Sequence, residues 1–372
     1  MKKILFLTGT RADFGKIKSL ISALEIHPDF EPFVFVTGMH LQHEYGYTLI
    51  EIERCQYKNI HTFSNHTHET TMDLTLAKTI EGLSAYCKEI KPDLIIVHGD
   101  RVETLAGAIT GSLNNILVAH IEGGELSGTV DELIRHSVTK LSHIHFVSND
   151  DAARRLIQMG EIASSIYTIG SPDIDIMFSS NLPALEAAKQ HYNIDFDTYA
   201  IAMFHPVTTE ASDMKRYAES FAKALLQDNH KYIIIYPNND LGSRFILEAY
   251  KPLNDRSRFR IFPSIRFEFF LVLLKHARFI IGNSSAGIRE APYYGIPVIN
   301  IGTRQQNRVL HADIVNVDYD TNSILTALSR IDAHEVRKTG DFGQGNSAAL
   351  FLQSLTNDDI WKIKHQKQFR DI

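Results

Sequence analysis

The sequence predicts an α/β protein of two doubly wound parallel sheets that face each other across a cleft. Short apolar runs, which are typical of buried strands, alternate with amphipathic stretches of helical period along most of the chain. A length of 372 residues is enough for two domains that each have a core of their own. A change of composition over 179–197 separates two such alternating series, and we place the domain boundary there.

The first alternating series starts at the N-terminus. We expect a buried strand at Lys2–Thr8, a turn at 9–16 and a helix that continues from there through Leu24. A long amphipathic helix is expected at Met72–Ile90, because Pro92 disfavours a helical residue before it. The remaining strands of this series are expected at 32–36, 59–63, 94–97, 116–119, 144–147 and 165–169.

The second series has the same alternation. Its strands are expected at 200–204, 232–236, 260–262, 279–281 and 298–301. Each of them ends in polar, glycine or proline residues, and ligands of open α/β sheets bind at the carboxyl ends of the strands. The residues that follow the strands of both series are therefore the candidates for a binding site.

Composition argues against several classes of protein. Apolar residues make up 44% of the chain and charged residues 22%, which is ordinary for a soluble globular protein. The net charge of −6 argues against a nucleic-acid binder, which normally has a basic face. The 2 cysteines suggest neither a disulfide framework nor a metal pattern, and every apolar run is shorter than the roughly 18 residues of a membrane span. The N-terminus lacks the features of a signal peptide, so we expect a cytoplasmic protein without membrane partners.

Three acidic residues stand near predicted strand ends. Asp100 and Glu122 follow two buried strands, and Asp131 comes just after a glycine-rich turn. Parallel strands would deliver such carboxylates to one crevice. Asp100 also begins a capping-box pattern with Glu103, and Thr129 begins another that includes Asp131, so both acids have a purely structural explanation as well. Glu122 caps nothing obvious, and a carboxylate directly after a buried strand needs a partner or a role.

The stretch 282–290, Gly-Asn-Ser-Ser-Ala-Gly-Ile-Arg-Glu, is predicted as a turn from a strand into a helix. Backbone amides at such a turn and the helix dipole favour phosphate, and Ser284 and Ser285 add hydroxyl donors beside Gly287. Glu290 lies further along, where it can reach a sugar diol. The structural alternative is a capped helix with a glycine packed against the sheet, and the pattern of a Walker loop is missing.

Two more groups of residues are candidates for the same cleft. The turn 9–16 carries Arg11 and Lys16, two cations that suit a diphosphate unless they belong to a solvated turn. This turn lacks the Gly-x-Gly-x-x-Gly spacing, so we expect no dinucleotide cofactor. His205 and Asn238 end strands of the second series, although a single histidine in such a place is more often a core or loop residue.

Two motifs at first suggest other functions. A histidine-rich run at 66–69, with His61 before it, looks like a metal site, but it lies in a polar loop without the His-Glu-x-x-His spacing of helical zinc sites. We therefore expect no metal. The basic tail at 362–370, beside Trp361, is expected to be a solvated helix face rather than a nucleic-acid patch.

Taken together, these stretches resemble the hydrolysing UDP-N-acetylglucosamine 2-epimerases of bacterial sialic acid biosynthesis and the epimerase half of the bifunctional animal enzyme. The stretches that carry the resemblance are GTRADFGK, VTGMH, HGDR, HIEGGELSGTVDELIRHSVTKLSHIHF, HPVTTE, YPNND, GNSSAGIRE and GTRQ. They extend from Gly9 to the loop around Arg304, and the central one is far too long and specific to arise by chance. Non-hydrolysing 2-epimerases share the layout but match these stretches less well.

The resemblance implies a GT-B fold, in which two Rossmann-like domains hold the active site in the cleft between them. It places the first domain at 1–178 and the UDP-binding domain at 179–354, with a C-terminal helix at about 355–372 that packs back on the first domain. The implied reaction converts UDP-N-acetylglucosamine to UDP and N-acetylmannosamine, by anti elimination of UDP to 2-acetamidoglucal and syn addition of water. It is the first step of sialic acid biosynthesis and needs no cofactor, and the family leads us to expect a homodimer or homotetramer.

By the same resemblance, the catalytic acids are Asp100, Glu122 and Asp131. The residues implied to bind UDP are Arg11, Lys16, Arg101, His205, Asn238, Ile265, Ser284, Ser285, Gly287, Glu290 and Arg304. Because crowded carboxylates repel each other, we expect at least one of the three acids to have a raised pKa.

Four other functions stay open at this point. A non-hydrolysing epimerase would return UDP-N-acetylmannosamine, and a hydrolysing one could act instead on the UDP-diacetamido-trideoxyhexose of the legionaminic acid pathway. A GT-B glycosyltransferase would share the nucleotide turn but would need an acceptor and leave carbon 2 of the sugar untouched. A nucleotide-sugar sensor would bind without turnover, which three clustered acids argue against.

Overall fold

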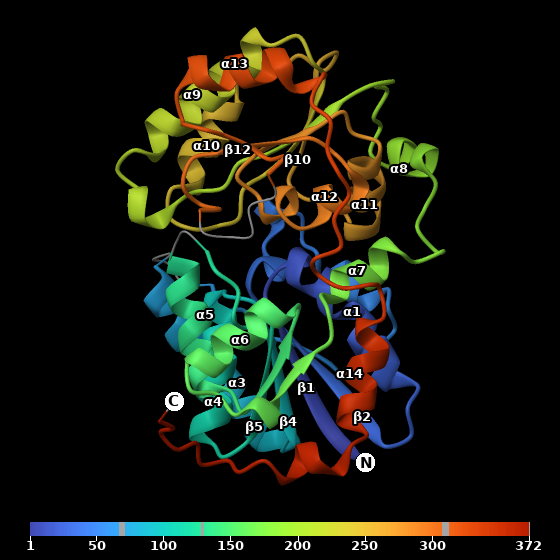
Figure 1. Cartoon of the computed structure of the whole chain (residues 1–372), viewed down its shortest axis with the longest axis vertical. Helices are drawn as coiled ribbons and strands as arrows, with labels where there is room; N and C mark the ends of the chain where they lie inside the picture. The colour runs from blue at the N-terminus through green and yellow to red at the C-terminus, as the bar shows by residue number, and fades with distance from the viewer. Residues whose placement is uncertain (67–70, 128–129, 307–311, 372) are drawn as a thin grey trace. The chain divides into compact units, whose positions relative to one another are not determined.

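The chain forms two parallel sheets, one of seven strands and one of six (Figure 1). The computed structural model describes residues 1–66, 71–127, 130–306 and 312–371. Contacts divide the chain into unit 1, which comprises Met1–Glu125, Asp131–Ser180 and Asp341–Ile372, and unit 2, which comprises Leu126–Val130 and Asn181–Gly340. Each sheet belongs to one unit, as the two alternating series of the sequence predict.

The sheet of unit 1 has the strand order β3-β2-β1-β4-β5-β6-β7, and its neighbouring strands are parallel. The strands are β1 Lys2–Thr8, β2 Phe30–Val36, β3 Ile60–Thr62, β4 Leu94–His98, β5 Leu117–Ile121, β6 Ile144–Val147 and β7 Ile166–Thr168. The direction in which strands are added reverses between β1 and β4. In a doubly wound sheet this reversal point is where ligands bind, outside the carboxyl ends of the strands.

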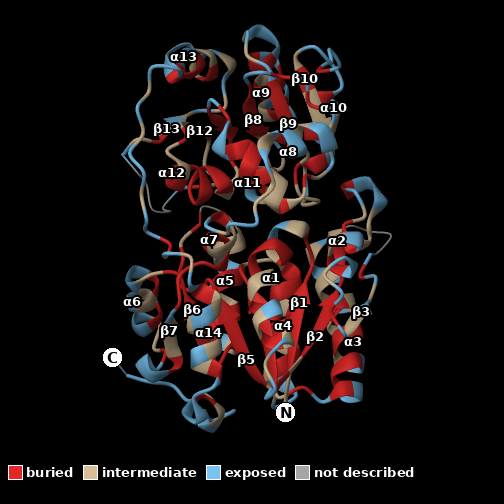
Figure 2. Cartoon of the chain, turned by 90° about the vertical axis from the view of Figure 1, so that its right-hand side faces the viewer, coloured by how far each residue is buried: buried red, intermediate tan, exposed pale blue. Residues whose placement is uncertain are grey.

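Helices cover both faces of this sheet (Figure 2). They are α1 Arg11–Glu25, α2 Leu49–Glu53, α3 Met72–Ile90, α4 Val102–Leu113, α5 Val130–Leu141, α6 Asp150–Gln158, α7 Pro172–Met177 and α14 Ser347–Leu355. Side chains alternate between the faces of a strand, so Ile4 and Phe6 of β1 pack with α1 and α14, whereas Leu5 and Leu7 pack with α3 and α4. Burial on both faces explains why the strands read as continuous apolar runs.

Unit 2 repeats the same winding with the order β10-β9-β8-β11-β12-β13. Its strands are β8 Ala200–Met203, β9 Tyr232–Ile235, β10 Phe259–Phe262, β11 Ile280–Gly282, β12 Val298–Ile301 and β13 Val315–Val317. Its helices are α8 Leu185–His191, α9 Met214–Gln227, α10 Ser243–Tyr250, α11 Phe267–Lys275, α12 Glu290–Tyr294 and α13 Thr321–Ile331. The reversal point lies between β8 and β11, so the doubly wound fold class is confirmed for both units.

Several predicted boundaries of elements differ from the structure, most of them by one or two residues. The helix α1 begins at Arg11, so most of the expected turn 9–16 is helical. Thr10 and Asp13 form a capping box that starts this helix. The Thr10 hydroxyl accepts a hydrogen bond from the Asp13 amide, and the Asp13 carboxylate accepts one from the Thr10 amide. The strand expected at 116–119 is β5, which starts one residue later and ends two residues later, and the strand β13 was not predicted.

The prediction of a helix at about 355–372 is also wrong. The C-terminal helix is α14, and only a 3-10 helix at Asp358–Lys362 follows it before the extended chain of 363–371. Phe351 of α14 packs on Phe6 and Phe146, with ring centroids 6.4 Å and 5.0 Å apart, whereas the mostly polar tail offers no comparable apolar stripe.

The basic tail is not a solvated helix face either. The Lys367 ammonium donates to the carbonyl oxygens of Thr139 and Ser142 at 3.2 and 2.6 Å and to Glu161 Oε2 at 2.6 Å. The tail therefore returns to α5 and the end of α6. Within the described part of the chain, every helix is too short or too polar to span a lipid bilayer.

Candidate active site

Asp100 lies at the reversal point of unit 1, just after β4. Gly99 has a φ of 78°, a left-handed conformation that turns the chain there at little cost for glycine. The carboxylate of Asp100 then accepts a charge-assisted hydrogen bond from Arg135 of α5. The expected capping box is not formed, because the helix α4 starts after Arg101, and Glu103 pairs with the Arg101 guanidinium at 3.4 Å instead.

Glu122 follows directly after β5 and is the most constrained of the three predicted acids. Its φ is 65°, which is rare for a residue other than glycine and marks a backbone held in place by its surroundings. The side chain is 5% exposed. Its Oε1 accepts a hydrogen bond from Ser171 at 2.6 Å and lies 3.5 Å from Lys16 Nζ, and its Oε2 lies 3.3 Å from His98 Nε2.

Arg135 joins the acids of this region. Besides Asp100, its guanidinium donates to the main-chain carbonyl of Glu122 at 2.6 Å, and it lies 3.7 Å from Glu125 Oε2. A planar fork of donors suits such a bridge, because one group can bond several oxygens in fixed directions. The turn after β4 and the turn after β5 are thereby tied to one buried cation.

Asp131 lies in the first turn of α5, where a carboxylate interacts favourably with the helix dipole. It stands one helical turn before Arg135, so both residues face the same side of α5. Thr129, which completes the second predicted capping box, lies outside the described residues. The structure therefore places Asp131 on the helix that holds Asp100.

His120 supports this arrangement from inside the sheet. Its Nε2 donates to the carbonyl oxygen of Gly99 across 2.8 Å, and its Nδ1 lies 3.2 Å from Thr139 Oγ1. Burial lowers the pKa of His120 to about 3, so the ring is neutral at physiological pH. As a neutral hydrogen-bond donor, His120 therefore holds the turn at Gly99, which precedes Asp100.

The cations that we expected to bind a diphosphate have carboxylate neighbours within unit 1. The Arg11 guanidinium lies 3.3 Å from Glu51 Oε1, which has a second pair with Arg54. Lys16 Nζ lies 3.4 Å from Asp173 Oδ2 and 3.5 Å from Glu122 Oε1. Lys16, in the second turn of α1, is therefore placed at two acids of unit 1.

The reversal point of unit 2 is organised by Asn283, which is fully buried. Its side-chain oxygen accepts from the His205 amide at 2.6 Å, and its side-chain nitrogen donates to the His205 carbonyl at 2.9 Å. The carbonyl of Asn283 accepts from Arg304 Nη1 at 3.1 Å and from Gln305 Nε2 at 2.8 Å. Through its side-chain amide and its main-chain carbonyl, Asn283 therefore joins the carboxyl ends of β8, β11 and β12.

The tautomer of His205 follows from its neighbour. The amide of Asn238 donates to His205 Nδ1 at 3.1 Å, so Nδ1 is an acceptor and the neutral ring carries its proton on Nε2. His205 and Asn238 thus follow adjacent strands, β8 and β9, and are bonded to each other. Ile265 follows β10 and is 5% exposed.

The turn after β11 has the features of a capped helix with a glycine packed against the sheet, which is the structural alternative to a phosphate site. Ser284 caps a 3-10 helix at Ser285–Gly287, because its hydroxyl accepts from the amide of Ala286 at 3.3 Å. A Cβ atom on Gly287 would lie 2.9 Å from Val298 Cγ1 of β12, which requires a residue without a side chain. Glu290 is the first residue of α12 and is 3% exposed.

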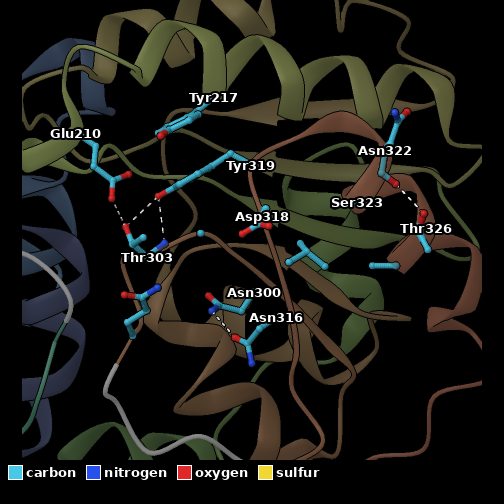
Figure 3. Close-up of a pocket in the computed structure, with 14 residues that line it drawn as sticks. Glu210, Tyr217, Asn300, Thr303, Asn316, Asp318, Tyr319, Asn322, Ser323 and Thr326 are labelled. Atoms are coloured by element: carbon cyan, nitrogen blue, oxygen red, sulfur yellow. Dashed lines mark hydrogen bonds between the residues drawn. The ribbon is translucent and has the colours of Figure 1, made fainter.

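A cavity of about 940 Å³ opens elsewhere in unit 2 (Figure 3). Figure 3 shows Tyr217 stacked on Tyr319, with ring centroids 3.7 Å apart, and Thr303 bonded to Glu210 beside them. Among the described residues that line it, Glu210 and Asp318 are acidic and none is lysine or arginine. Such a lining disfavours a diphosphate, so we do not assign the nucleotide to this cavity.

The structure describes only part of the histidine-rich run that looked like a metal site. His68 and Glu69 lie at 67–70, outside the described residues, while His61 stacks on Tyr86 with ring centroids 4.0 Å apart. Across the described ranges, no three His, Cys, Asp or Glu side chains come together as a metal site.

Sequence reasoning missed several residues of these two regions. They are His98, Arg135, Ser171, Asp173 and Asn283. A signal existed for two of them: Arg135 stands four residues after Asp131 on one helix, and Asn283 follows a strand-ending glycine. The remaining partners are joined by the fold, so residue spacing could not indicate them.

Comparisons with known proteins agree on one family. The family model described as UDP-N-acetylglucosamine 2-epimerase matches residues 22–356. A UDP-N-acetylglucosamine 2-epimerase of Neisseria meningitidis serogroup B is 50% identical and aligns over 100% of both chains. A hydrolyzing UDP-N,N'-diacetylbacillosamine 2-epimerase of Legionella pneumophila is 32% identical, over 95% of this chain and 96% of its own.

Solved structures show the same architecture. The UDP-GlcNAc 2-epimerase of Methanocaldococcus jannaschii, in complex with UDP-GlcNAc and UDP, aligns with a TM-score of 0.82 over 96% of this chain and 99% of its own, at 21% identity. The UDP-GlcNAc 2-epimerase of Neisseria meningitidis, bound to UDP-GlcNAc, gives a TM-score of 0.78 over 95% and 99%, at 18% identity. The fold is therefore the GT-B type that the resemblance implies.

Proposed function

The chain belongs to the UDP-N-acetylglucosamine 2-epimerase family, and from this premise we propose that it is a hydrolysing epimerase that converts UDP-N-acetylglucosamine to UDP and N-acetylmannosamine. The observation that carries the proposal is the acid cluster at the reversal point of unit 1. There Arg135 bonds the carboxylate of Asp100 and the main-chain carbonyl of Glu122, and Asp131 lies one turn before it on the same helix. A sugar that loses a proton at carbon 2 and a leaving group at carbon 1 needs several acid–base groups. The hydrolyzing relative of Legionella pneumophila supports the release of free UDP.

The proposed reaction has two steps. In the first, a carboxylate takes the proton from carbon 2, the bond between carbon 1 and the diphosphate oxygen breaks, and UDP leaves 2-acetamidoglucal behind. In the second, water adds across the double bond: carbon 2 receives a proton from the face opposite to the one that lost it, and carbon 1 receives the hydroxyl group. The product is N-acetylmannosamine, with no change in oxidation state overall.

The geometry suggests a division of work among the acids. Asp100 is paired with the buried Arg135 guanidinium, which favours the carboxylate over the protonated acid. It therefore suits stabilisation of positive charge at carbon 1, as carboxylates do in glycosidases. Glu122 and Asp131 remain for the proton transfers at carbon 2 and at water.

UDP is proposed to be bound by the residues that the resemblance implies. They are Arg11, Arg101, His205, Asn238, Ile265, Ser284, Ser285, Gly287, Glu290 and Arg304, together with Lys16 at the edge of the acid cluster. Arg304 and the amides of the turn after β11 would compensate the charge that develops on the leaving diphosphate. His205 carries its proton on Nε2, which can donate to a phosphate oxygen.

One experiment tests this function. We expect UDP-N-acetylglucosamine, incubated with the protein in heavy water and followed by proton NMR, to yield free UDP and N-acetylmannosamine with deuterium at carbon 2. The Glu122→Gln variant is the matched control and should give little product. Formation of UDP-N-acetylmannosamine without free UDP would instead identify a non-hydrolysing epimerase, and product without deuterium would exclude the elimination.

A second substrate is favoured by one specific observation. The relative of Legionella pneumophila acts, by its name, on UDP-N,N'-diacetylbacillosamine. We therefore propose to compare kcat/KM for this diacetamido-trideoxyhexose and for UDP-N-acetylglucosamine side by side. A preference for the former would move the protein to the legionaminic acid pathway, whereas our proposal places it at the first step of sialic acid biosynthesis. A homodimer or homotetramer stays a prediction, which light scattering can check.

A further inference from the structure

The short helix α7 directs two polar side chains toward Glu122. Ser171 stands at the position before the helix, from which a serine normally caps the first turn with its hydroxyl. That hydroxyl donates to Glu122 Oε1 at 2.6 Å instead. The Ser171 hydroxyl therefore fixes the Glu122 carboxylate and leaves α7 without the stabilisation that a side-chain cap would provide.

Asp173, two residues further along, is fully buried and faces Lys16. Its Oδ1 accepts from the amide of Ile174 at 3.0 Å, and its Oδ2 lies 3.4 Å from Lys16 Nζ. The same ammonium lies 3.5 Å from Glu122 Oε1. One buried cation is therefore shared by two buried carboxylates that lie 51 residues apart in sequence, at positions 122 and 173.

The titratable and charged groups around Glu122 come from four elements. Lys16 of α1 and His98 of β4 face its carboxylate, Asp173 of α7 faces Lys16, and Arg135 of α5 bonds its main-chain carbonyl. Burial strengthens electrostatic interactions between these groups, because little water screens them. A change of charge at Asp173 will therefore be felt at Glu122.

We propose that Asp173 is a positioning residue, which holds the Lys16 ammonium and through it sets the orientation and proton affinity of Glu122. This inference rests on the proposed function, because Glu122 is there one of the catalytic acids. It gives Lys16 a role at the acid in addition to the contact with UDP that is proposed above. Ser171 completes the same support by fixing one oxygen of Glu122.

The test compares two carboxylates of the same helix, Asp173, which is fully buried, and Asp175, which is partly buried. Asp173→Asn removes the charge that holds Lys16 and keeps the size of the side chain. The matched control is Asp175→Asn, because the Asp175 carboxylate accepts from the amides of Ser347 and Ala348 at 2.8 and 2.7 Å and so holds the start of α14. We expect Asp173→Asn to lower kcat about tenfold or more, with KM and the Kd for UDP changed by less than about threefold. Asp175→Asn should lower the Tm but change kcat by less than about twofold.

A second comparison asks whether Asp173 acts through Glu122. In the Glu122→Gln background, Asp173→Asn should cost less than about twofold further in kcat, because the group that it positions is already absent. An equal loss in both backgrounds would overturn the proposal, and so would an Asp173→Asn protein with the kcat of the wild type.

A measurement without turnover separates this inference from the proposed function. In a protein labelled with ¹³C at its glutamate carboxyl groups, the titration of Glu122 should move to lower pH in Asp173→Asn. The sign follows because a nearby negative charge, which disfavours a second carboxylate, is removed. An unchanged titration would refute the positioning role. If the wild type releases no UDP, the proposed function fails, and the titration still decides about Asp173.

Discussion

The guanidinium of Arg135 offers the sharpest test of how the acids are held. It is 3% exposed, and it pairs with Asp100 and Glu125, whose side chains are 19% and 9% exposed. Replacing Arg135 by methionine keeps much of its volume and leaves two carboxylates without this cation. Removal of one partner from a buried ion pair costs about 3–5 kcal/mol, and the partial exposure of Asp100 favours the lower end, about 3 kcal/mol.

This loss can be measured in two ways. For a domain of this size, about 3 kcal/mol corresponds to a Tm lower by roughly 6–12 °C in a thermal melt followed by circular dichroism. Release of UDP should fall at least about 100-fold, because Asp100 and the turn of Glu122 lose the group that orients them. Arg135→Lys should recover part of the stability but stay about tenfold slower, since a single ammonium cannot reproduce the fork of donors.

The control for Arg135 is an arginine whose ion pair is exposed. Arg154 pairs with Asp151 on α6, and their side chains are 71% and 50% exposed. Arg154→Met should therefore cost less than about 1 kcal/mol and leave turnover unchanged. If Arg135→Met melts within about 2 °C of the wild type, the bridge between the two turns is not an important support, and our account of the site is wrong.

Three further predictions follow from the same structure. Asp100→Asn, Glu122→Gln and Asp131→Asn should each lower kcat by about 100-fold or more in the UDP-release assay, the usual weight of one acid–base or charge-stabilising group, and wild-type turnover in any of them would remove that residue from the mechanism. Glu161 is buried, which alone raises its pKa, but hydrogen bonds from His145, Lys140 and Lys367 outweigh burial and lower the pKa to about 2. Glu161→Gln should therefore be less stable than the wild type in urea at neutral pH, and the difference should shrink as pH falls from the ordinary value of 4.5 toward 2; a constant difference over that range would contradict the assignment. Because burial lowers the pKa of His120 to about 3, its ¹⁵N NMR signals should stay those of a neutral ring down to about pH 4, and protonation near pH 6.5 would refute its support of the Gly99 turn.

Local pattern was sufficient for most of the secondary structure. Met72–Ile90 and Ile144–Val147 have the predicted bounds, because helical and strand periods are properties of short stretches. The errors occurred where a local pattern competes with something else. A capping box extended α1 back to Arg11, and the tail after Asp358–Lys362 is held by Lys367 and its oxygen partners instead of by helix formation.

The predicted site residues divide in the same way. Asp100 and Glu122 stand at the carboxyl ends of adjacent strands, as their sequence positions indicate, because parallel winding brings such ends to one edge. The roles of their neighbours did not follow from position. Lys16 lies within α1 and close to an acid, and Asn283, which follows a predicted strand, proved to be the residue that joins three strand ends.

By itself, the sequence determined two parallel sheets with acids after two strands of the first and a small-residue turn after a strand of the second, since apolar periodicity and strand ends are written into consecutive residues. Only the tertiary structure decided which charges meet. Lys16 and Glu122 are 106 positions apart, Ser171 and Glu122 are 49 apart, and Arg135 and Asp100 are 35 apart. Such pairs depend on the order of strands and on the direction of each side chain, which arise when the whole sheet is packed, so no short stretch of the chain specifies them.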